Sequence, residues 1–227
     1  LVVEGSANSG IQILSGTSSE GAIYFGDSGD NNNGVIRYDH SNLTMDMFVA
    51  AGERLTIGQH AVGIDNAALE TWHTTFAPLQ IGGAASLMSH VTQADGSAFH
   101  ISNNAYYDST NSRWEYISTN ADDEAANYYQ ANGHHYFRTT AAAGADDAAI
   151  TWATALEITN DSDVIFFDDD GSTEKMRWDA STNRLGIGTS APDDLLHVYS
   201  GNSGATPHSS SIVNIESAGT ATLSFLT

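Results

Sequence analysis

Apolar and polar residues alternate along much of this 227-residue chain with a period of two, which is the period of a β-strand. Residues 150–158 follow this alternation, and so does the run from Lys175 to Trp178. In a strand, this spacing places Met176 and Trp178 on one face, and Lys175 and Arg177 on the other. The alternation therefore predicts strands as the main secondary structure.

Asn-Gly and Asp-Gly pairs separate these alternating segments. Both pairs readily adopt the positive φ angles of the tight turns that join antiparallel strands. They occur at Asn33-Gly34, Asp95-Gly96, Asn132-Gly133 and Asp170-Gly171. Four such signals predict an all-β fold of consecutive short antiparallel hairpin or sandwich modules. Residues 121–127 are the likeliest helical stretch, and they are too few for a stable helix.

A short phrase recurs at residues 38–42, 107–111 and 178–183, and each copy is an aromatic residue, an Asp and a turn of Ser, Thr or Asn. A larger unit at residues 53–58 resembles residues 183–188. Asp and Asn side chains bond local backbone amides in such turns. A chain of small hairpin modules cannot bury both of its faces alone, so neighbouring modules or other chains must cover them.

The two ends of the chain also resemble each other, which predicts a fragment of a longer, repeating polypeptide. The matching segments are residues 1–5 with 196–200, 11–13 with 213–215, and 22–25 with 222–225. We expect a Gly-Ile-Gly-Thr-x-x-Pro turn before Leu1, and a turn rich in Gly, Asp or Asn after Thr227. The first residues do not read as a signal peptide, and no run approaches the ~20 apolar residues of a membrane span.

These patterns divide the chain into four predicted units. Residues 1–58 form a first β module, and residues 59–160 form a central module with aromatic hairpins. Residues 161–198 form a hairpin that ends in a Gly-Ile-Gly-Thr-x-x-Pro turn, and residues 199–227 begin a further repeat.

The composition excludes several classes of partner. Charged residues are 15% of the chain, against ~25% in typical globular domains. The 28 acidic and seven basic residues give a formal net charge of −21. Nucleic acids and anionic lipids are bound by clustered Lys and Arg, so we expect neither nucleic-acid binding nor membrane insertion. The chain has no cysteine, which excludes disulfides and thiolate sites.

Gly186 to Ala191 match the Gly-x-Gly-x-x-Ala fingerprint of dinucleotide sites. That fingerprint binds pyrophosphate only where a strand leads into a helix N-terminus. Here Pro192 follows at once, and then Asp193 and Asp194 would repel phosphate. We predict no bound cofactor.

Two acidic clusters, at residues 122–124 and 168–170, contain the kind of oxygen ligands that Ca²⁺ prefers. Neither has calcium-loop spacing, so we favour solvated turn carboxylates and predict no metal site. The adjacent His134 and His135 point to opposite faces of a strand, although axial histidines from three chains would be able to share a metal ion.

Aromatic residues cluster at 106–107, 114–116 and 128–129, where exposed rings would bind carbohydrate. We favour a place in the β core, because aromatic rings contribute the most buried area. No nucleophile elbow occurs, and a pair of acids for glycan hydrolysis cannot be selected from 28. We therefore predict no catalytic residues, and the receptor-binding residues stay unknown.

The chain resembles bacteriophage tail fibres of the marine, repeat-built type. The resemblance rests on residues 21–27, 34–41 and 52–57, on the Gly-Ile-Gly-Thr-x-x-Pro phrase within 183–192 with 196–198, and on the middle from 79 to 138. In such fibres this phrase often precedes a self-cleaving chaperone domain. No Ser-Lys pair of that domain is found here, and Lys175 is the only lysine.

The resemblance implies an elongated homotrimer on the virion. Its expected partners are copies of itself, other virion tail proteins, and a glycan or protein of the host surface. The expected function is a structural component that spans towards or binds the host cell. A tailspike-type glycan-degrading enzyme and a bacterial surface adhesin repeat are the alternatives.

Overall fold

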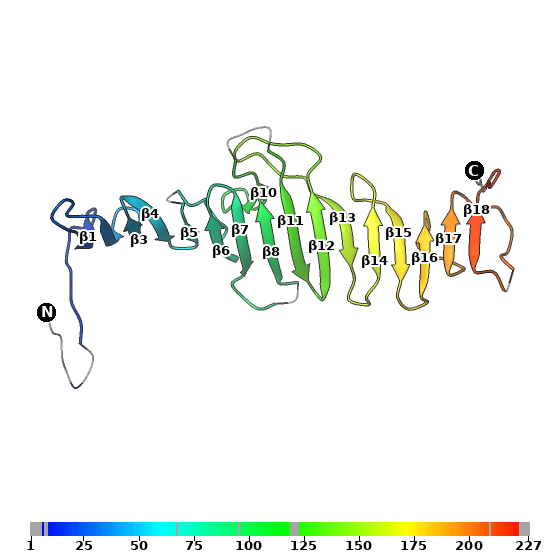
Figure 1. Cartoon of the computed structure of the whole chain (residues 1–227), viewed down its shortest axis with the longest axis horizontal. Coiled ribbons are helices and arrows are strands. Elements are labelled where there is room, and N and C mark those ends of the chain that lie inside the picture. The colour runs from blue at the N-terminus through cyan, green and yellow to red at the C-terminus, as the bar shows by residue number, and fades with distance from the viewer. Residues whose placement is uncertain are drawn as a thin grey trace.

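A computed structural model of the chain describes residue 6 and residues 9–66, 68–94, 96–118, 123–208 and 210–222. Within these residues the chain is all-β and contains no helix, which confirms the predicted fold class. Sixteen strands form one long sheet, in which neighbours along the chain are neighbours in space. Figure 1 shows the strands crossing the long axis of an extended molecule.

The first half of the sheet contains β1 (Glu20–Phe25), β2 (Gly34–Asp39), β3 (Thr44–Val49), β4 (Gly52–Ile57), β5 (Val62–Ile64), β6 (Phe76–Ile81), β7 (Ala85–His90) and β8 (Ala98–Asn103). The second half contains β11 (Ala126–Ala131), β12 (His134–Thr139), β13 (Ala153–Ile158), β14 (Val164–Phe167), β15 (Glu174–Asp179), β16 (Arg184–Ile187), β17 (Leu196–Tyr199) and β18 (Val213–Glu216). The short strands β9 (Tyr106–Tyr107) and β10 (Trp114–Glu115) form a separate two-stranded sheet.

Most neighbouring strands are antiparallel, and the parallel pairs in the described sheet are β5–β6, β16–β17 and β17–β18. The predicted tight turn at Asn132-Gly133 joins β11 to β12, with φ angles of 52° and 82°. The other three predicted turn signals also fall between or at the start of paired strands, although Asp95 lies outside the described residues. The sheet continues across the boundaries expected at residues 58, 160 and 198.

The described part of residues 121–127 contains no helix, in line with a stretch too short for a stable one. Strand β11 begins at Ala126, and Asn127 pairs with Ser102 of β8 and Arg138 of β12. Residues 121 and 122 lie outside the described residues. A weak local preference for helix is overridden here, because two neighbouring strands supply hydrogen-bond partners for this segment.

The recurring Asp phrase forms the same turn in all three places. Its carboxylate accepts a backbone N–H from a residue two or three positions further on, at Asp39, Asp108 and Asp179. The residue four positions after each Asp has a positive φ angle, which is 59° at Leu43, 51° at Ser112 and 57° at Asn183. Hydrogen bonds from Ser181 and Thr182 lower the pKa of Asp179 to about 2.

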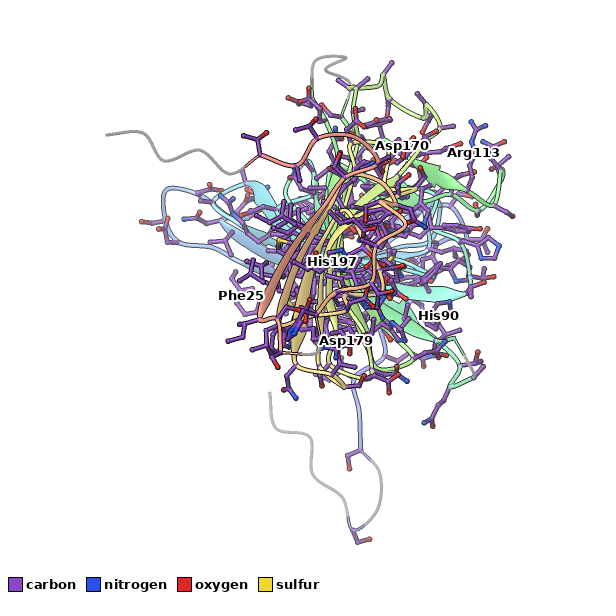
Figure 2. The ribbon with its side chains drawn as sticks, turned by 90° about the vertical axis from the view of Figure 1, so that its right-hand side faces the viewer. Phe25, His90, Arg113, Asp170, Asp179 and His197 are labelled. Atoms are coloured by element: carbon purple, nitrogen blue, oxygen red, sulfur yellow. The ribbon has the colours of Figure 1, made fainter. Side chains whose placement is uncertain are left out.

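The long sheet has two different faces. We call the face that contains Arg37, Asp46, Thr56 and Gln80 the covered face, and the opposite face the open face; cross-strand pairing places successive residues on each. We use the term excursions for three connections that carry buried side chains or side chains packed against the core, at residues 65–66 with 68–75, at 104–118 and at 140–152. In Figure 2, Phe25 of the open face lies on one side of the strands, and His90 and Arg113 lie on the other.

The buried core lies under these excursions. One cluster joins Trp72, Tyr106 and Ile117 of the excursions to Phe76 of β6 and Met88 of β7. A second cluster is formed by Ala105, Tyr116 and Ala125. The sheet is thus locally thickened near β6 to β12, on the covered face.

A candidate interaction surface

Large apolar side chains are exposed on the open face along the whole length of the sheet. Those that are 38–60% exposed are Ile23, Phe25, Met45, Met47, Val49, Ile57, Ile64, Ile81, Phe99, Ile101, Phe137, Phe166, Trp178, Ile187, Val213 and Ile215. They share one face because pairs such as Ile23–Ile36, Ile36–Met47 and Met47–Leu55 lie directly opposite each other. The open face is therefore a mostly apolar surface.

At these exposures, the sixteen side chains leave on the order of 1,000 Å² of apolar surface uncovered in one chain. The largest apolar patch of a typical monomeric protein is ~300–600 Å². The sequence predicted the face on which Met176 and Trp178 lie and the need for other modules or chains to cover a face, and it did not predict which face is left uncovered.

The open face also lacks charge. Apart from the bulged residues Arg54 and Lys175, the strand positions on this face of the described sheet carry no Asp, Glu, Lys or Arg. The chain as a whole has a net charge of −21, so its charged residues are concentrated away from the open face. In the sequence, this face is visible as uncharged residues at every second position of each strand. The register between neighbouring strands then brings these positions together on one face.

Apart from Arg54 and Lys175, the ionic groups of the described strands lie on the covered face, and several of them form pairs. Arg37 Nε donates to Asp46 Oδ2 at 3.0 Å, and the same guanidinium reaches Glu20 at 2.9 Å. Burial alone would lower the pKa of Arg37, but Asp46, Glu20 and the nearby Glu53 together raise it. In the second half of the sheet, Arg177 pairs in the same way with Asp163 and Glu174.

Buried polar side chains also lie on the covered face, and they hydrogen-bond to loops that leave the sheet. Gln80 Oε1 accepts hydrogen bonds from Glu70 N and from Trp72 Nε1. His197 Nδ1 accepts one from Asp193 N at 3.3 Å. Each of these residues lies opposite a glycine of a parallel neighbouring strand, Gly63 in the first case and Gly186 in the second.

The aromatic clusters are divided between the core and both faces. Tyr106 and Tyr116 are buried, which confirms the core interpretation for these two residues. On the covered face, Tyr129 stacks on Tyr136 with ring centroids 4.4 Å apart, and Arg138 lies over the Tyr129 ring at 4.2 Å. Burial lowers the pKa of Arg138 to about 10.

His100 is the buried neighbour of this stack. Its ring is stacked on Tyr129, and it is 5% exposed. Burial lowers the pKa of His100 to about 4, despite a hydrogen bond to Asn127 that opposes the shift. The imidazole is therefore neutral near pH 7, as a core residue must be.

His134 and His135 point to opposite faces, as predicted. His134 Nδ1 lies 2.6 Å from Glu157 Oε1 on the covered face. His135 Nδ1 lies 2.6 Å from the hydroxyl of Tyr128 on the open face. The Tyr128 hydroxyl also accepts a hydrogen bond of 2.7 Å from Gln130 Nε2, so these three side chains form one polar group within the apolar surface.

The dinucleotide-like phrase forms a turn and not a phosphate site. Strand β16 leads through this turn into the parallel strand β17, where the fingerprint requires a helix. Gly188 has a φ of 80°, and a Cβ there would collide with the carbonyl oxygen of Tyr199. A Cβ on Gly186 would lie 2.5 Å from the carbonyl oxygen of Thr189. The glycines permit close backbone approach.

The two copies of the larger repeat take different places in the sheet. Residues 53–58 and 183–188 are similar in sequence, but β4 is antiparallel to both neighbours, whereas β16 pairs in parallel with β17. The geometric counterpart of β16 is β5, which pairs in parallel with β6 and carries Gly63, whose added Cβ would lie 2.5 Å from Asn66 O.

The acidic clusters form local turns in the part of the chain that the structure describes. Asp168 accepts backbone hydrogen bonds from Ser172 and Thr173, and these lower its pKa. Asp123 accepts a hydrogen bond from Ser118, and Asp122 lies outside the described residues. Among the described residues, no group of three or more His, Asp or Glu side chains is arranged to hold a metal ion.

Comparison with known proteins gives this chain no family. No protein-family model matches it, and a search of curated proteins finds no match. Over the described residues, no helix is long and apolar enough to cross a membrane. The predictions about the turns before Leu1 and after Thr227 concern segments outside the described residues.

Proposed function

We propose that this chain is a structural segment of a virion tail fibre, which spans towards or binds the host cell surface. The observation that carries the proposal is a one-layer sheet whose strands follow one another along a single axis, with one uncovered apolar face. At ~4.8 Å per strand, sixteen strands extend over roughly 70 Å. Such a module is extended along one axis, as a spacer must be.

The open face needs a partner, and other copies of the same chain fit it best. Its uncovered area exceeds the ~800 Å² that each partner buries in a standard stable interface. Copies of an acidic chain repel one another, and a face without charge is where such copies approach at the lowest electrostatic cost. Apolar faces are also self-complementary, so no second protein is required.

Three copies would place their open faces around a common axis. The excursions and ionic groups of the covered faces would then be directed outwards into water. The number three comes from the resemblance to homotrimeric tail fibres. The chain ends would connect to other virion tail proteins, and the outer surface would be the part that meets a glycan or protein of the host.

We further propose that these residues have no enzymatic role. Polar side chains described above hold turns and loops, as the Asp179 carboxylate, Gln80 Oε1 and His197 do. Incubation of the folded chain with capsular and surface polysaccharides checks this, with release of reducing ends as the readout. Turnover of any polysaccharide would favour the tailspike alternative.

Two measurements test the structural proposal. Native mass spectrometry of the folded chain should give three copies, and a stable folded monomer would contradict it. Antibodies against the chain should label an extended appendage in electron micrographs of virus particles. Label on capsids or on bacterial cells would place the protein elsewhere.

A further inference from the structure

The polar group on the open face lies at the middle of a mostly apolar surface, on which Ser89, Asn103 and Thr139 are the other polar residues of strands β7 to β12. Gln130 and His135 lie directly opposite each other on β11 and β12, and Tyr128 hydrogen-bonds to both. The strands β11 and β12 are the ninth and tenth of the sixteen in the sheet. We call these three residues the polar layer.

The immediate neighbours of Gln130 and His135 on the adjacent strands are apolar. Along the same row of the open face, Phe99 of β8 precedes Gln130, and Ile158 of β13 follows His135. The row continues through Val164 and Trp178. Polar side chains at this place contribute nothing to an apolar interface, so their presence requires another explanation.

The bonds within one chain leave part of the polar layer without partners. Tyr128 occupies Nδ1 of His135 and one N–H of Gln130. Among the described residues, His135 Nε2 and Gln130 Oε1 make no hydrogen bond. Gln130 Oε1 is an acceptor, and His135 Nε2 is a donor or an acceptor according to the histidine tautomer. Both atoms are therefore able to bond to the polar layer of another copy.

We propose that the polar layer fixes the axial register in which copies of this chain pack through their open faces. This inference rests on the proposed assembly of copies. Apolar rows repeat along the sheet with the strand spacing, so a slip of two strands, about 9.5 Å, again places apolar side chains on apolar side chains. The apolar surface therefore selects register only weakly.

The polar layer removes this ambiguity. In register, the layers of different copies meet, and Gln130 and His135 hydrogen-bond across the interface. Out of register, each layer faces aliphatic side chains, and its donors and acceptors are buried without partners. A single buried polar residue specifies the register of coiled coils by the same mechanism.

The test measures distance between copies, and the absence of cysteine allows one spin label per chain. Asp161→Cys places the label in the exposed turn between β13 and β14, outside the strands. In the otherwise unchanged full chain, double electron–electron resonance should give one narrow distance between copies. In the Gln130→Leu/His135→Leu variant, we expect a second population or a broadened distribution, consistent with shifts of about 9.5 Å.

A matched control changes the same face without removing polar groups. Phe166→Leu/Met176→Leu should keep the single distance. If the double Leu variant does not fold, His135→Leu alone gives the same readout. The variants should keep the copy number of the parent chain, because added apolar area strengthens the interface.

Other outcomes refute either the register role of the polar layer or the assembly of copies itself. A Gln130→Leu/His135→Leu variant that keeps the narrow single distance refutes the register role alone. A folded variant that no longer assembles shows that the polar layer supplies affinity, which also refutes it. A parent chain that is monomeric, or that captures only lipid or an unrelated protein, refutes the assembly of copies and the polar layer together.

Discussion

A single negative charge on the open face should prevent assembly. We choose Ile101→Asp, because Ile101 is 45% exposed in one chain and lies on β8 near the middle of the sheet. The side chain is directly opposite Leu87 and Tyr128 on its neighbouring strands. Half of its surface is already in water, so the isolated chain should keep its fold.

The magnitude follows from burial and desolvation. Covering the remaining half of an Ile side chain contributes about 1 kcal/mol. An unpaired carboxylate in an apolar interface adds several kcal/mol of cost. We therefore expect Ile101→Asp to weaken assembly by about 4 kcal/mol per copy, which is about a thousandfold per copy.

Sedimentation velocity over a range of concentrations measures this effect. The control is Asn132→Asp, which adds the same charge at the tip of the β11–β12 turn and keeps the acceptor for Gly96 N. We expect the control to assemble like the parent chain and Ile101→Asp to sediment as a monomer. If both variants assemble with the affinity of the parent, the open face is not the interface and the reasoning is refuted.

Three further predictions concern the stability of the folded chain. The pKa of His100 is lowered on folding, so its contribution is present above the ordinary pKa of 6.5 and is lost as the pH falls towards 4. Chemical denaturation at pH 7 and pH 4 should show that His100→Gln removes about 3 kcal/mol of the pH dependence, and an unchanged pH dependence would contradict this. Leu43→Asn should raise the free energy of unfolding by about 1 kcal/mol, because Asn tolerates the positive φ of 59° better; unchanged stability would contradict this. Gly188→Ala should destabilise the chain by more than ~2 kcal/mol in thermal unfolding, and Gly83→Ala, which has open space, should cost little.

Local patterns predicted the strands because their physical causes are local. The positive φ of Asn132 and the Asx bonds of Asp39 and Asp179 depend on residues within a few positions of the turn. The prediction that His134 and His135 point apart follows from the pleat alone. These features needed no knowledge of distant neighbours.

Other features depended on partners far apart in the sequence. The similarity of residues 53–58 to 183–188 suggested equal roles, but the parallel pairing belongs to β5 and β16, where a glycine allows close backbone approach. Asn127 is in a strand because Ser102 and Arg138 lie beside it. No local pattern contains that information.

The sequence by itself determined that the chain is built of strands and which residues share a face, since the period of two is a property of each strand alone. Only the tertiary structure decided which face is covered. Excursions such as residues 104–118 pack over the covered face, where their side chains Tyr106 and Tyr116 are buried. The open face stays uncovered in one chain, because contacts between distant segments decide over which face the excursions pack. The alternation within each strand does not contain this information.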